Sequence, residues 1–253
     1  RAFRMINTNM QWISTANEYA LNTLKAKKIA VIADTSGYGT ASAKSAIALL
    51  EKAGVKPVYS VLIDANKTDV MDEMTKARNA GADIVMPWSA ATGLLGRLLN
   101  ARGEMGWDVN VVGHPALMAA QIRKLLNKPE YWEKTYAAGY VSTTYLPDGK
   151  LPAPTQALVN KVRPLIGGGE IDITFWWVAL GYDTVKMVEH AIKKAGSTDP
   201  AAIQKVMEET KNFPGVYATY SYSATQRDGF PDSNMMMNTA NTFKDGSFKP
   251  APR

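Results

Sequence analysis

Apolar runs of strand length alternate with amphipathic helical stretches over residues 27–147, and this alternation limits the fold more than any other feature of the chain. The runs KKIAVIAD and ADIVMPWS are apolar at almost every position, as strands buried on both faces of a parallel sheet are. Each run is followed by a stretch with helical spacing that is long enough to cross over to a parallel strand. We expect helices over 9–26, 40–54 and 68–81, the last with Thr68 or Asp69 as its cap, and one short helix over 116–127. The sequence therefore predicts an α/β fold, an open parallel sheet flanked by helices, with strands at 27–34, 57–64, 82–89, 109–113 and 136–147.

The rest of the chain has a different organisation. LPDGKLPAP, at 146–154, holds three prolines and a glycine and predicts a linker. Helical spacing then predicts three helices that have no sheet of their own, the last with Pro200 near its first position, and the tail holds only short strands. We expect a crossing segment, a complete α/β lobe, and a second lobe with its C-terminal crossing, at 1–9, 10–146 and 147–253. We also expect this second lobe to be incomplete at its N-terminal side, with its early strands upstream of residue 1.

Composition argues against several functions. The chain has no cysteine, which removes disulfides, thiol nucleophiles and cysteine-based metal sites. Its net charge of +6 comes from scattered Lys and Arg, so we expect no nucleic-acid partner. Clustered His, Asp or Glu, a GxSxG elbow and a GxxxxGK[ST] loop are all missing from the sequence, so we expect no metal site and no P-loop. No apolar stretch reaches the roughly 20 residues of a membrane span. The opening RAFRMINTN is not a signal peptide, although an exported precursor would have lost one.

One motif keeps a nucleotide-binding alternative open. GYGTAS, at 37–42, is a variant of the dinucleotide fingerprint, and Asp64 ends the next predicted strand, where Rossmann enzymes place an acid on the ribose. A NAD-dependent oxidoreductase is therefore an alternative. However, serine replaces the third glycine, and Tyr38 between the first two would crowd a pyrophosphate. A flexible helix start explains the same glycines, so we expect neither a cofactor nor enzyme activity.

The strand ends carry the candidate ligand-binding residues, because ligands of open parallel sheets bind beyond the carboxyl ends of the strands. The groups found there are hydroxyls, aromatic rings and backbone N–H at helix starts, which suit an apolar pocket with a few polar contacts. The candidates are Ser36, Tyr38, Trp88, Ser89, Ala90, His114 and Pro115. Core packing for Trp88, a solvent-facing turn for Tyr38 and a helix-capping role for His114 remain open.

Several segments, in this order, resemble the periplasmic solute-binding proteins of the leucine/isoleucine/valine type. A D-x-x-x-YG string follows the first predicted strand, and the opening AFRMINTNMQWISTANEYALNTLKAKKIAVI resembles the F-R segment of that family. GADIVMPWSAATGLLGRLLNARGEMGW and ALGYDTVKMVEHAIKKAGSTDPAAIQKVMEE resemble two further segments, and GVYATYSYSATQRDG resembles a late segment whose glycines and aspartate are degraded here. The resemblance covers nearly the whole chain and implies the type I periplasmic binding fold, which has two lobes.

The resemblance also implies a function. Such a protein is the extracytoplasmic component of an ABC importer, periplasmic or lipid-anchored, and it captures a small solute between its lobes by hinge closure. Its partners are that solute and a membrane permease. We expect the hinge near 5–9 and 145–152. A ligand-sensing regulator of the same fold is an alternative.

By position, the resemblance assigns roles to some candidates. Tyr38 corresponds to the aromatic residue that faces the ligand, and Ser89 and Ala90 correspond to the loop after the third strand. Trp177 falls near a hinge-side aromatic residue that can line the cleft. Pro115, beside His114, falls where amino-acid binders place an acid on the ligand's ammonium group. A buried ammonium without a carboxylate is costly, so among amino acid-like solutes we favour an amide or an aromatic carboxylate over a branched-chain amino acid.

Overall fold

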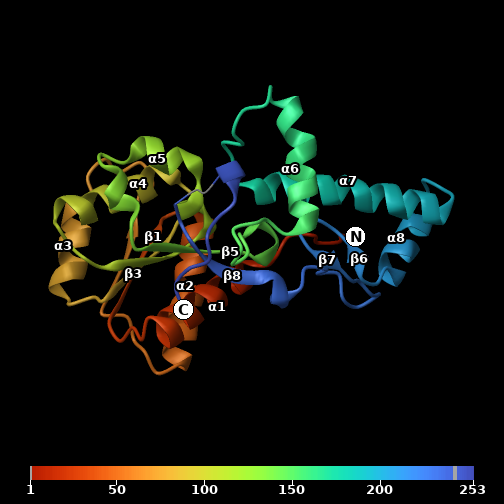
Figure 1. Ribbon diagram of the computed structural model, residues 1–253. Coiled ribbons are helices and arrows are strands. Elements are labelled where there is room, and N and C mark those ends of the chain that lie inside the picture. The colour runs from red at the N-terminus through yellow and green to blue at the C-terminus, as the bar shows by residue number, and fades with distance from the viewer. Residues whose placement is uncertain (1, 242–243) are drawn as a thin grey trace. The chain divides into compact units, whose positions relative to one another are not determined.

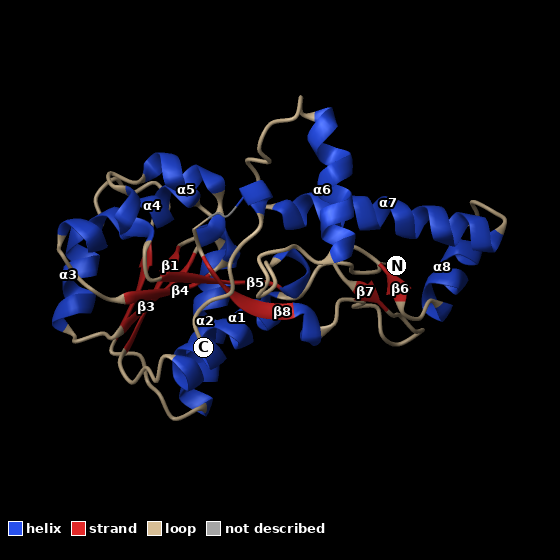
Figure 2. Ribbon diagram, viewed as in Figure 1, coloured by secondary structure: helices blue, strands red, loops and turns tan. Residues whose placement is uncertain are grey.

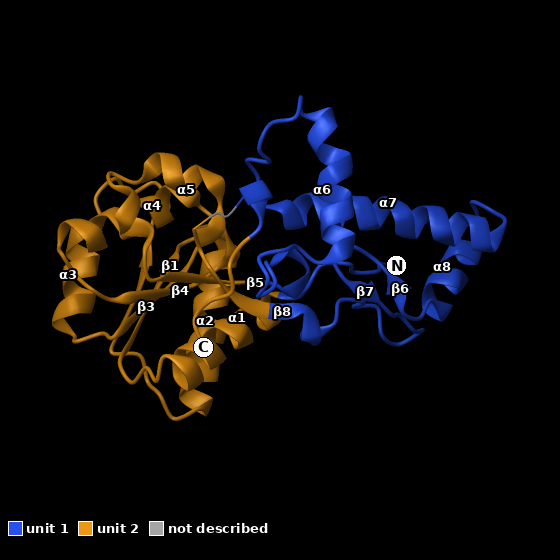
Figure 3. Cartoon of the chain, viewed as in Figure 1, with its two compact units in different colours: residues 1–8, 140–235, 244–247 blue, residues 9–139, 236–243, 248–253 orange. Residues whose placement is uncertain are grey.

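The computed structural model describes residues 2–241 and 244–253. The chain divides into two compact units, which Figure 3 colours separately. Unit 1 comprises residues 1–8, 140–235 and 244–247, and unit 2 comprises residues 9–139, 236–243 and 248–253. Among the described helices, none combines the length and the apolar character that crossing a bilayer requires.

A six-stranded sheet forms the centre of unit 2, in the order β2-β1-β3-β4-β5-β8. Each neighbouring pair from β2 to β5 is parallel. The strands are β1 (Ile29–Asp34), β2 (Tyr59–Ile63), β3 (Ile84–Trp88), β4 (Asn110–Gly113), β5 (Thr135–Tyr140) and β8 (Met235–Thr239). The predicted α/β fold class with a parallel sheet is thus confirmed.

Helices cover both faces of this sheet, which explains why its central strands are apolar throughout. All residues of β1 and β3 are buried. Figures 1 and 2 show α1 and α2 on one face and α3, α4 and α5 on the other. Buried leucines of α4, such as Leu94 and Leu98, pack in one core cluster with Val85 and Val111 of the sheet. The helices are α1 (Asn9–Glu18), α2 (Gly37–Lys52), α3 (Met71–Asn79), α4 (Thr92–Glu104) and α5 (Ala120–Leu125).

Local capping moves two helix starts away from their predicted positions. Helix α2 begins at Gly37 rather than Thr40, because the Ser36 hydroxyl accepts the Gly39 N–H at 3.0 Å and caps the helix earlier. The expected cap of α3 at Thr68 or Asp69 is wrong by one or two residues. The Asp69 carboxylate instead closes a turn by accepting the Met71 N–H at 2.8 Å.

The single helix expected after β4 is interrupted. A short 3₁₀ helix, Pro115–Met118, comes first, and Ala119 then adopts an extended conformation before α5. The His114 ring accounts for the tight first turn, because its Nδ1 accepts the Ala116 N–H at 3.0 Å.

Unit 1 is mostly helical, as expected. Its elements are α6 (Ala153–Leu165), α7 (Phe175–Ala195), α8 (Pro200–Glu209), β6 (Phe213–Pro214) and β7 (Thr219–Tyr220). Helix α8 begins as the sequence indicates, with Pro200 in the first turn and the Asp199 carboxylate accepting two backbone N–H groups. The named strands that lie wholly in the described part of this unit, β6 and β7, have two residues each.

The units divide at Tyr140, earlier in the chain than the Pro-rich segment expected as a linker. The Tyr140 ring lies within 6 Å, centroid to centroid, of the rings of Trp176, Tyr217 and Phe230, all in unit 1. Residues 146–154 also belong to unit 1, and the Leu146 N–H donates to the Lys150 carbonyl within a turn there. Tyr140 therefore packs with unit 1, although it is the last residue of β5. A further division, after Thr8, falls inside the expected crossing at 1–9.

Candidate functional site

The candidate site lies in unit 2, at the carboxyl ends of β1 and β3. These strands are neighbours at the centre of the sheet, and the chain leaves β1 toward one edge and β3 toward the other. Open α/β sheets bind ligands at such a topological switch point. The loops at this point run from β1 into α2 and from β3 into α4. The carboxyl end of β4, where His114 follows, lies next to β3.

A buried carboxylate ties the two loops together. Asp34, the last residue of β1, is 3% exposed, and its Oδ1 accepts the Ser36 N–H at 2.9 Å. The hydroxyls of Ser36 and Ser89 also bind this carboxylate. Burial acts to raise the pKa of Asp34, but these hydrogen bonds outweigh burial and lower the pKa below its ordinary value. Asp34 is therefore ionised at neutral pH, and its charge is used to position the loops.

Gly39 is required by its close approach to Asp34. A Cβ placed on Gly39 would lie 2.5 Å from Asp34 Oδ1 and would also overlap the Asp34 carbonyl oxygen. The preceding Gly37 has open space at the same position. The second glycine of the fingerprint-like string thus has a structural explanation that involves no nucleotide.

Tyr38 is held in place by a polar network from two helices. Its hydroxyl donates to Asn9 Oδ1 at 3.1 Å, and Asn9 Nδ2 donates to Ser42 Oγ at 3.0 Å. Ser42 in turn donates to the Tyr38 carbonyl at 2.8 Å. Burial raises the pKa of the Tyr38 hydroxyl to about 12, so the phenol is neutral at all physiological pH values. The side chain is half-buried, which leaves part of it accessible.

His114 lies between two aromatic rings. Its ring centroid is 5.1 Å from that of Tyr38 and 5.1 Å from that of Trp12, in edge-on contacts. The imidazole is 7% exposed, and burial lowers its pKa to about 4 against the opposing effects of the Asp34 charge and a hydrogen bond to the Ser89 backbone. One ring nitrogen accepts the Ala116 N–H, and the ring also binds the Ser89 backbone. The imidazole is therefore neutral and fixed in position beside Tyr38 and Trp12.

The remaining candidates differ in accessibility. The loops that follow β1, β3 and β4 form the rim of the sheet at the carboxyl ends of these strands. Ala90 and Ser36 are exposed on this rim, and Ser89 and Pro115 are buried beneath it. Trp88 is fully buried in β3, which supports the core-packing interpretation left open for it. Trp177 belongs to unit 1, where it is 55% exposed on α7 and stacks on Trp176 with ring centroids 4.0 Å apart.

Two residues of this constellation, Asn9 and Trp12, were not among the sequence-based candidates. They lie on α1, which precedes the first strand of the sheet, and only the packing of α1 on α2 brings them to Tyr38 and His114. The sequence offered one indirect signal, an asparagine at the start of a predicted helix. Asp34 was visible at the strand end, but its hydrogen bonds to both loops were not.

The residues at the rim can contact a solute, but few of them carry a group that is available as a nucleophile, an acid or a base. Both serine hydroxyls are engaged with Asp34. Across the described residues, no group of three or more His, Asp or Glu side chains is placed to hold a metal ion.

Nearly the whole chain is similar to known proteins. A family model described as "Periplasmic binding protein" matches residues 1–247. An "Amino acid binding protein" of Pseudomonas aeruginosa is 29% identical over 212 residues, which cover 84% of this chain and 53% of that protein. The "Leu/Ile/Val-binding protein homolog 3" of Brucella melitensis is 28% identical over 228 residues, which cover 88% and 57%. The chain thus spans about half the length of the curated relatives it matches.

A solved structure shows the same fold. The leucine binding protein LivK of Thermotoga maritima superposes with a TM-score of 0.80 at 17% identity, over 99% of this chain and 67% of that one. The resemblance to the leucine/isoleucine/valine-binding type and the type I periplasmic binding fold, both expected from the sequence, are therefore confirmed.

Proposed function

Because this chain belongs to the periplasmic binding protein family, we propose that it is the solute-capturing component of an ABC importer and works outside the cytoplasm. In this proposal a solute binds first to the rim of unit 2, and a hinge motion then encloses it with unit 1. The closed form is the one that the membrane permease recognises. Hinge closure around a ligand is an established type of domain motion, and the chain crosses between its units after Thr8, before Tyr140, after Met235 and on each side of the short segment 244–247.

The observation that supports this proposal best is the fixed aromatic wall at the switch point. Tyr38, His114 and Trp12 contact one another through their rings, and the hydroxyl of Tyr38 is satisfied by Asn9 before any ligand arrives. Rigid aromatic surfaces bind solutes with little loss of conformational freedom. Because the neighbouring polar groups are neutral or internally paired, the arrangement favours retention of a solute over its chemical conversion.

The chemistry of the rim favours particular solutes. Asp34 is buried and already accepts several hydrogen bonds, so it is poorly placed to pair with an ammonium group. The N-termini of α2 and α4 supply backbone N–H groups that favour a carboxylate. We therefore propose an amino acid-like solute, an amide or an aromatic carboxylate whose ring stacks on Tyr38. The names of the relatives favour the amino acid, and the rim favours the amide or the aromatic acid.

Isothermal titration calorimetry of the 253-residue chain with isoleucine, isoleucine amide and phenylacetate tests the proposal. We expect measurable binding of at least one of them. Tyr38→Ala should weaken it by at least about tenfold, or about 1.4 kcal/mol, because the ring is lost. Tyr38→Phe is the matched control, since it keeps the ring and removes only the hydrogen bond to Asn9, and should retain most of the affinity.

Circular dichroism should show that both variants are folded. If Tyr38→Ala binds as tightly as the unmodified chain, Tyr38 is not part of the site. If none of the three solutes binds, the proposed function fails for these solute classes.

A further inference from the structure

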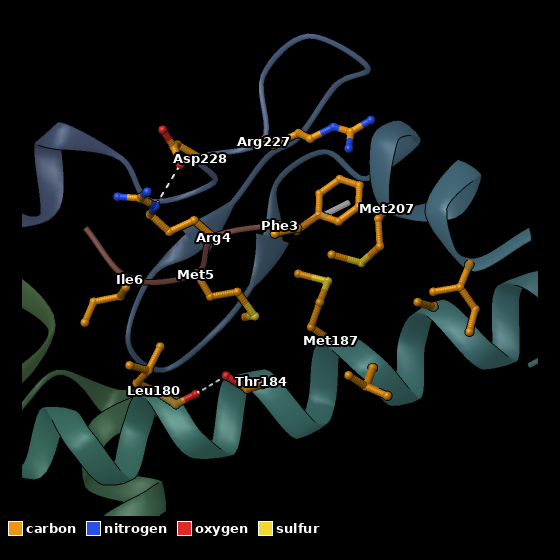
Figure 4. A pocket seen from close by; sticks show the side chains of 14 residues that line it. Phe3, Arg4, Met5, Ile6, Leu180, Thr184, Met187, Met207, Arg227 and Asp228 are labelled. Carbon is orange, nitrogen blue, oxygen red and sulfur yellow. Dashed lines mark hydrogen bonds and ion pairs between the residues drawn. The ribbon is translucent and has the colours of Figure 1, made fainter. Parts of the chain in front are cut away.

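The positive charge of the chain is distributed unevenly between its two units. Unit 2 holds 17 of the 29 Lys and Arg residues but only 12 of the 23 Asp and Glu residues. In unit 1, Figure 4 shows Arg4 and Asp228 at the edge of an apolar groove, where they pair at 3.0 Å. On α7 of the same unit, Lys193 pairs with Glu189 at 2.6 Å. Most of the net charge of +6 therefore belongs to unit 2.

Five lysines of unit 2 lie at the amino ends of β1 and β2, and we call them the lysine patch. Lys25, Lys27 and Lys28 precede β1, and Lys52 and Lys56 lie between the last turn of α2 and the start of β2. All five are exposed. The candidate solute site lies at the carboxyl ends of the strands, so the lysine patch lies at the opposite edge of the same sheet.

The register of the two strands brings these lysines together. Strands β1 and β2 are parallel, with Ala30 beside Tyr59. Carried back to the strand starts, this register sets Lys56 beside Lys27, and neighbouring strands of a sheet lie only about 5 Å apart. Residues that are scattered in the sequence thus meet on one surface.

The charge of the lysine patch has little compensation from acids. In the described part of the chain, none of its five side chains forms an ion pair with a carboxylate. The carboxylate of Asp83, at the same edge, instead accepts the backbone N–H groups of Lys27 and Lys28, at 2.9 Å and 3.1 Å. Glu51 is the other acid beside these lysines, so positive charge remains in excess.

The composition of the patch favours a lipid surface over a nucleic acid. Segments 25–28 and 51–58 contain no aromatic residue and no arginine, whereas surfaces that bind single-stranded nucleic acid stack bases on aromatic rings and on guanidinium groups. Lysine carries a compact charge on a flexible stem, which suits phosphate groups whose positions in a fluid surface are not fixed. Val58 is 37% exposed beside the patch and offers an apolar side chain to the headgroup region.

We propose that the lysine patch binds the surface of a membrane that contains anionic phospholipids, through their phosphate groups. Each lysine near such a surface strengthens binding about fivefold, and the attraction extends over a Debye length of roughly 10 Å at about 0.1 M salt. A membrane contact at this edge leaves the opposite edge of the sheet, with Tyr38 and His114, accessible to a solute. The contact goes beyond the proposed function and requires no solute.

Co-sedimentation of the 253-residue chain with lipid vesicles tests the proposal. One set of vesicles is pure phosphatidylcholine, and the other also contains about 30% phosphatidylglycerol, which is anionic. At low salt, we expect binding to the anionic vesicles to be at least about tenfold stronger than binding to the neutral ones. In about 0.5 M NaCl, where the charges are screened, this difference should disappear.

Two double variants with the same net charge provide a matched pair. Lys27→Gln with Lys28→Gln removes two charges of the patch and should weaken binding to the anionic vesicles by at least about tenfold. Lys193→Gln with Lys194→Gln removes two adjacent, exposed lysines of α7 in unit 1 and should change the binding less than about twofold. All four side chains are exposed, so both variants should keep the fold, which circular dichroism checks.

Three results would overturn the proposal: equal binding to the two kinds of vesicle, binding that salt does not weaken, or equal effects of the two double variants. A single-stranded oligonucleotide covers the other kind of anionic partner. If it binds more tightly than the anionic vesicles, and the variant at Lys27 and Lys28 loses that binding, the patch is a nucleic-acid site instead. No solute is present in these experiments, so their result is separate from that of the proposed function.

Discussion

His114 shows how one buried side chain can set the chemistry of a whole rim. The ring is a hydrogen-bond acceptor for the 3₁₀ helix that follows it and an aromatic neighbour for Tyr38 and Trp12. Both roles use the neutral imidazole, and burial keeps it neutral by lowering its pKa to about 4. Protonation would add a charge to a desolvated position and remove the acceptor for the Ala116 N–H. The same residue is thus a structural cap and part of the candidate binding wall.

This environment makes stability depend on pH. Because the folded-state pKa of His114 is about 4 and an exposed histidine has about 6.5, the unfolded chain binds more protons between these values. The contribution of His114 is complete above about pH 6.5 and is lost as the pH falls toward 4, by about 2 kcal/mol at pH 5. We expect the fall in melting temperature from pH 7 to pH 5 to be smaller in His114→Gln, measured by differential scanning calorimetry.

His190→Gln, which replaces the other histidine of the chain, is the control for this measurement. If both variants change the pH dependence to the same extent, buried His114 is not its source. Asp34 remains ionised over this range because its pKa is lowered, so it does not titrate together with His114.

At the scale of elements, Asp183 connects the long helix of unit 1 to the hairpin of β6 and β7. The carboxylate is buried in the middle of α7 and accepts the N–H groups of Val216 and Tyr217, each at 2.8 Å, and the Tyr220 hydroxyl at 3.0 Å. A Cβ at Gly215 would collide with this carboxylate. Burial raises the pKa of Asp183 while these hydrogen bonds oppose the rise. The two-residue strands of this hairpin are therefore held by a side chain as well as by their own pairing.

Removal of this connection should destabilise unit 1. We expect Asp183→Ala to lower the free energy of unfolding by about 1–3 kcal/mol, because three donors, two of them buried, lose their acceptor. Asp183→Asn should have a smaller effect, since its amide keeps one acceptor oxygen. Urea unfolding followed by tryptophan fluorescence measures both, and Thr184→Ala, at an exposed neighbour on the same helix, is the control. An equal loss in the Thr184 variant would contradict the role given to Asp183.

At the scale of the whole molecule, the two units differ in how their backbones are bonded. In unit 2, β1 is bonded to strands on both sides and is buried along its whole length. In the described part of unit 1, most of the regular structure is helical, and β6 and β7 pair over two residues. Local opening is easier where fewer apolar contacts and fewer hydrogen bonds between neighbouring strands must break.

We therefore expect native-state hydrogen exchange, followed by mass spectrometry, to divide along these units. The slowest amides should lie in β1 and β3, and those of α6 and α8 should exchange substantially faster. Exchange at one common slow rate in both units would show instead that the chain opens as a single cooperative body.

The sequence by itself determined where the main strands and helices form. The apolar runs predicted β1 and β3, and Pro200 predicted the start of α8, because these features act over a few neighbouring residues. Tyr38, Ser36 and His114 are candidates for a similar reason, since each lies in the turn that follows a predicted strand. Whether they contact a solute stays a prediction.

Only the tertiary structure decided the strand order, the contact of Asn9 and Trp12 with the rim, and the passage between units at Tyr140. These features depend on side chains that are distant in sequence and meet only when the sheet and its helices pack. Local backbone preferences are readable in a sequence because neighbouring residues set them. Packing partners cannot be read from a sequence in this way, because many distant residues compete for the same buried position and only the complete fold selects among them.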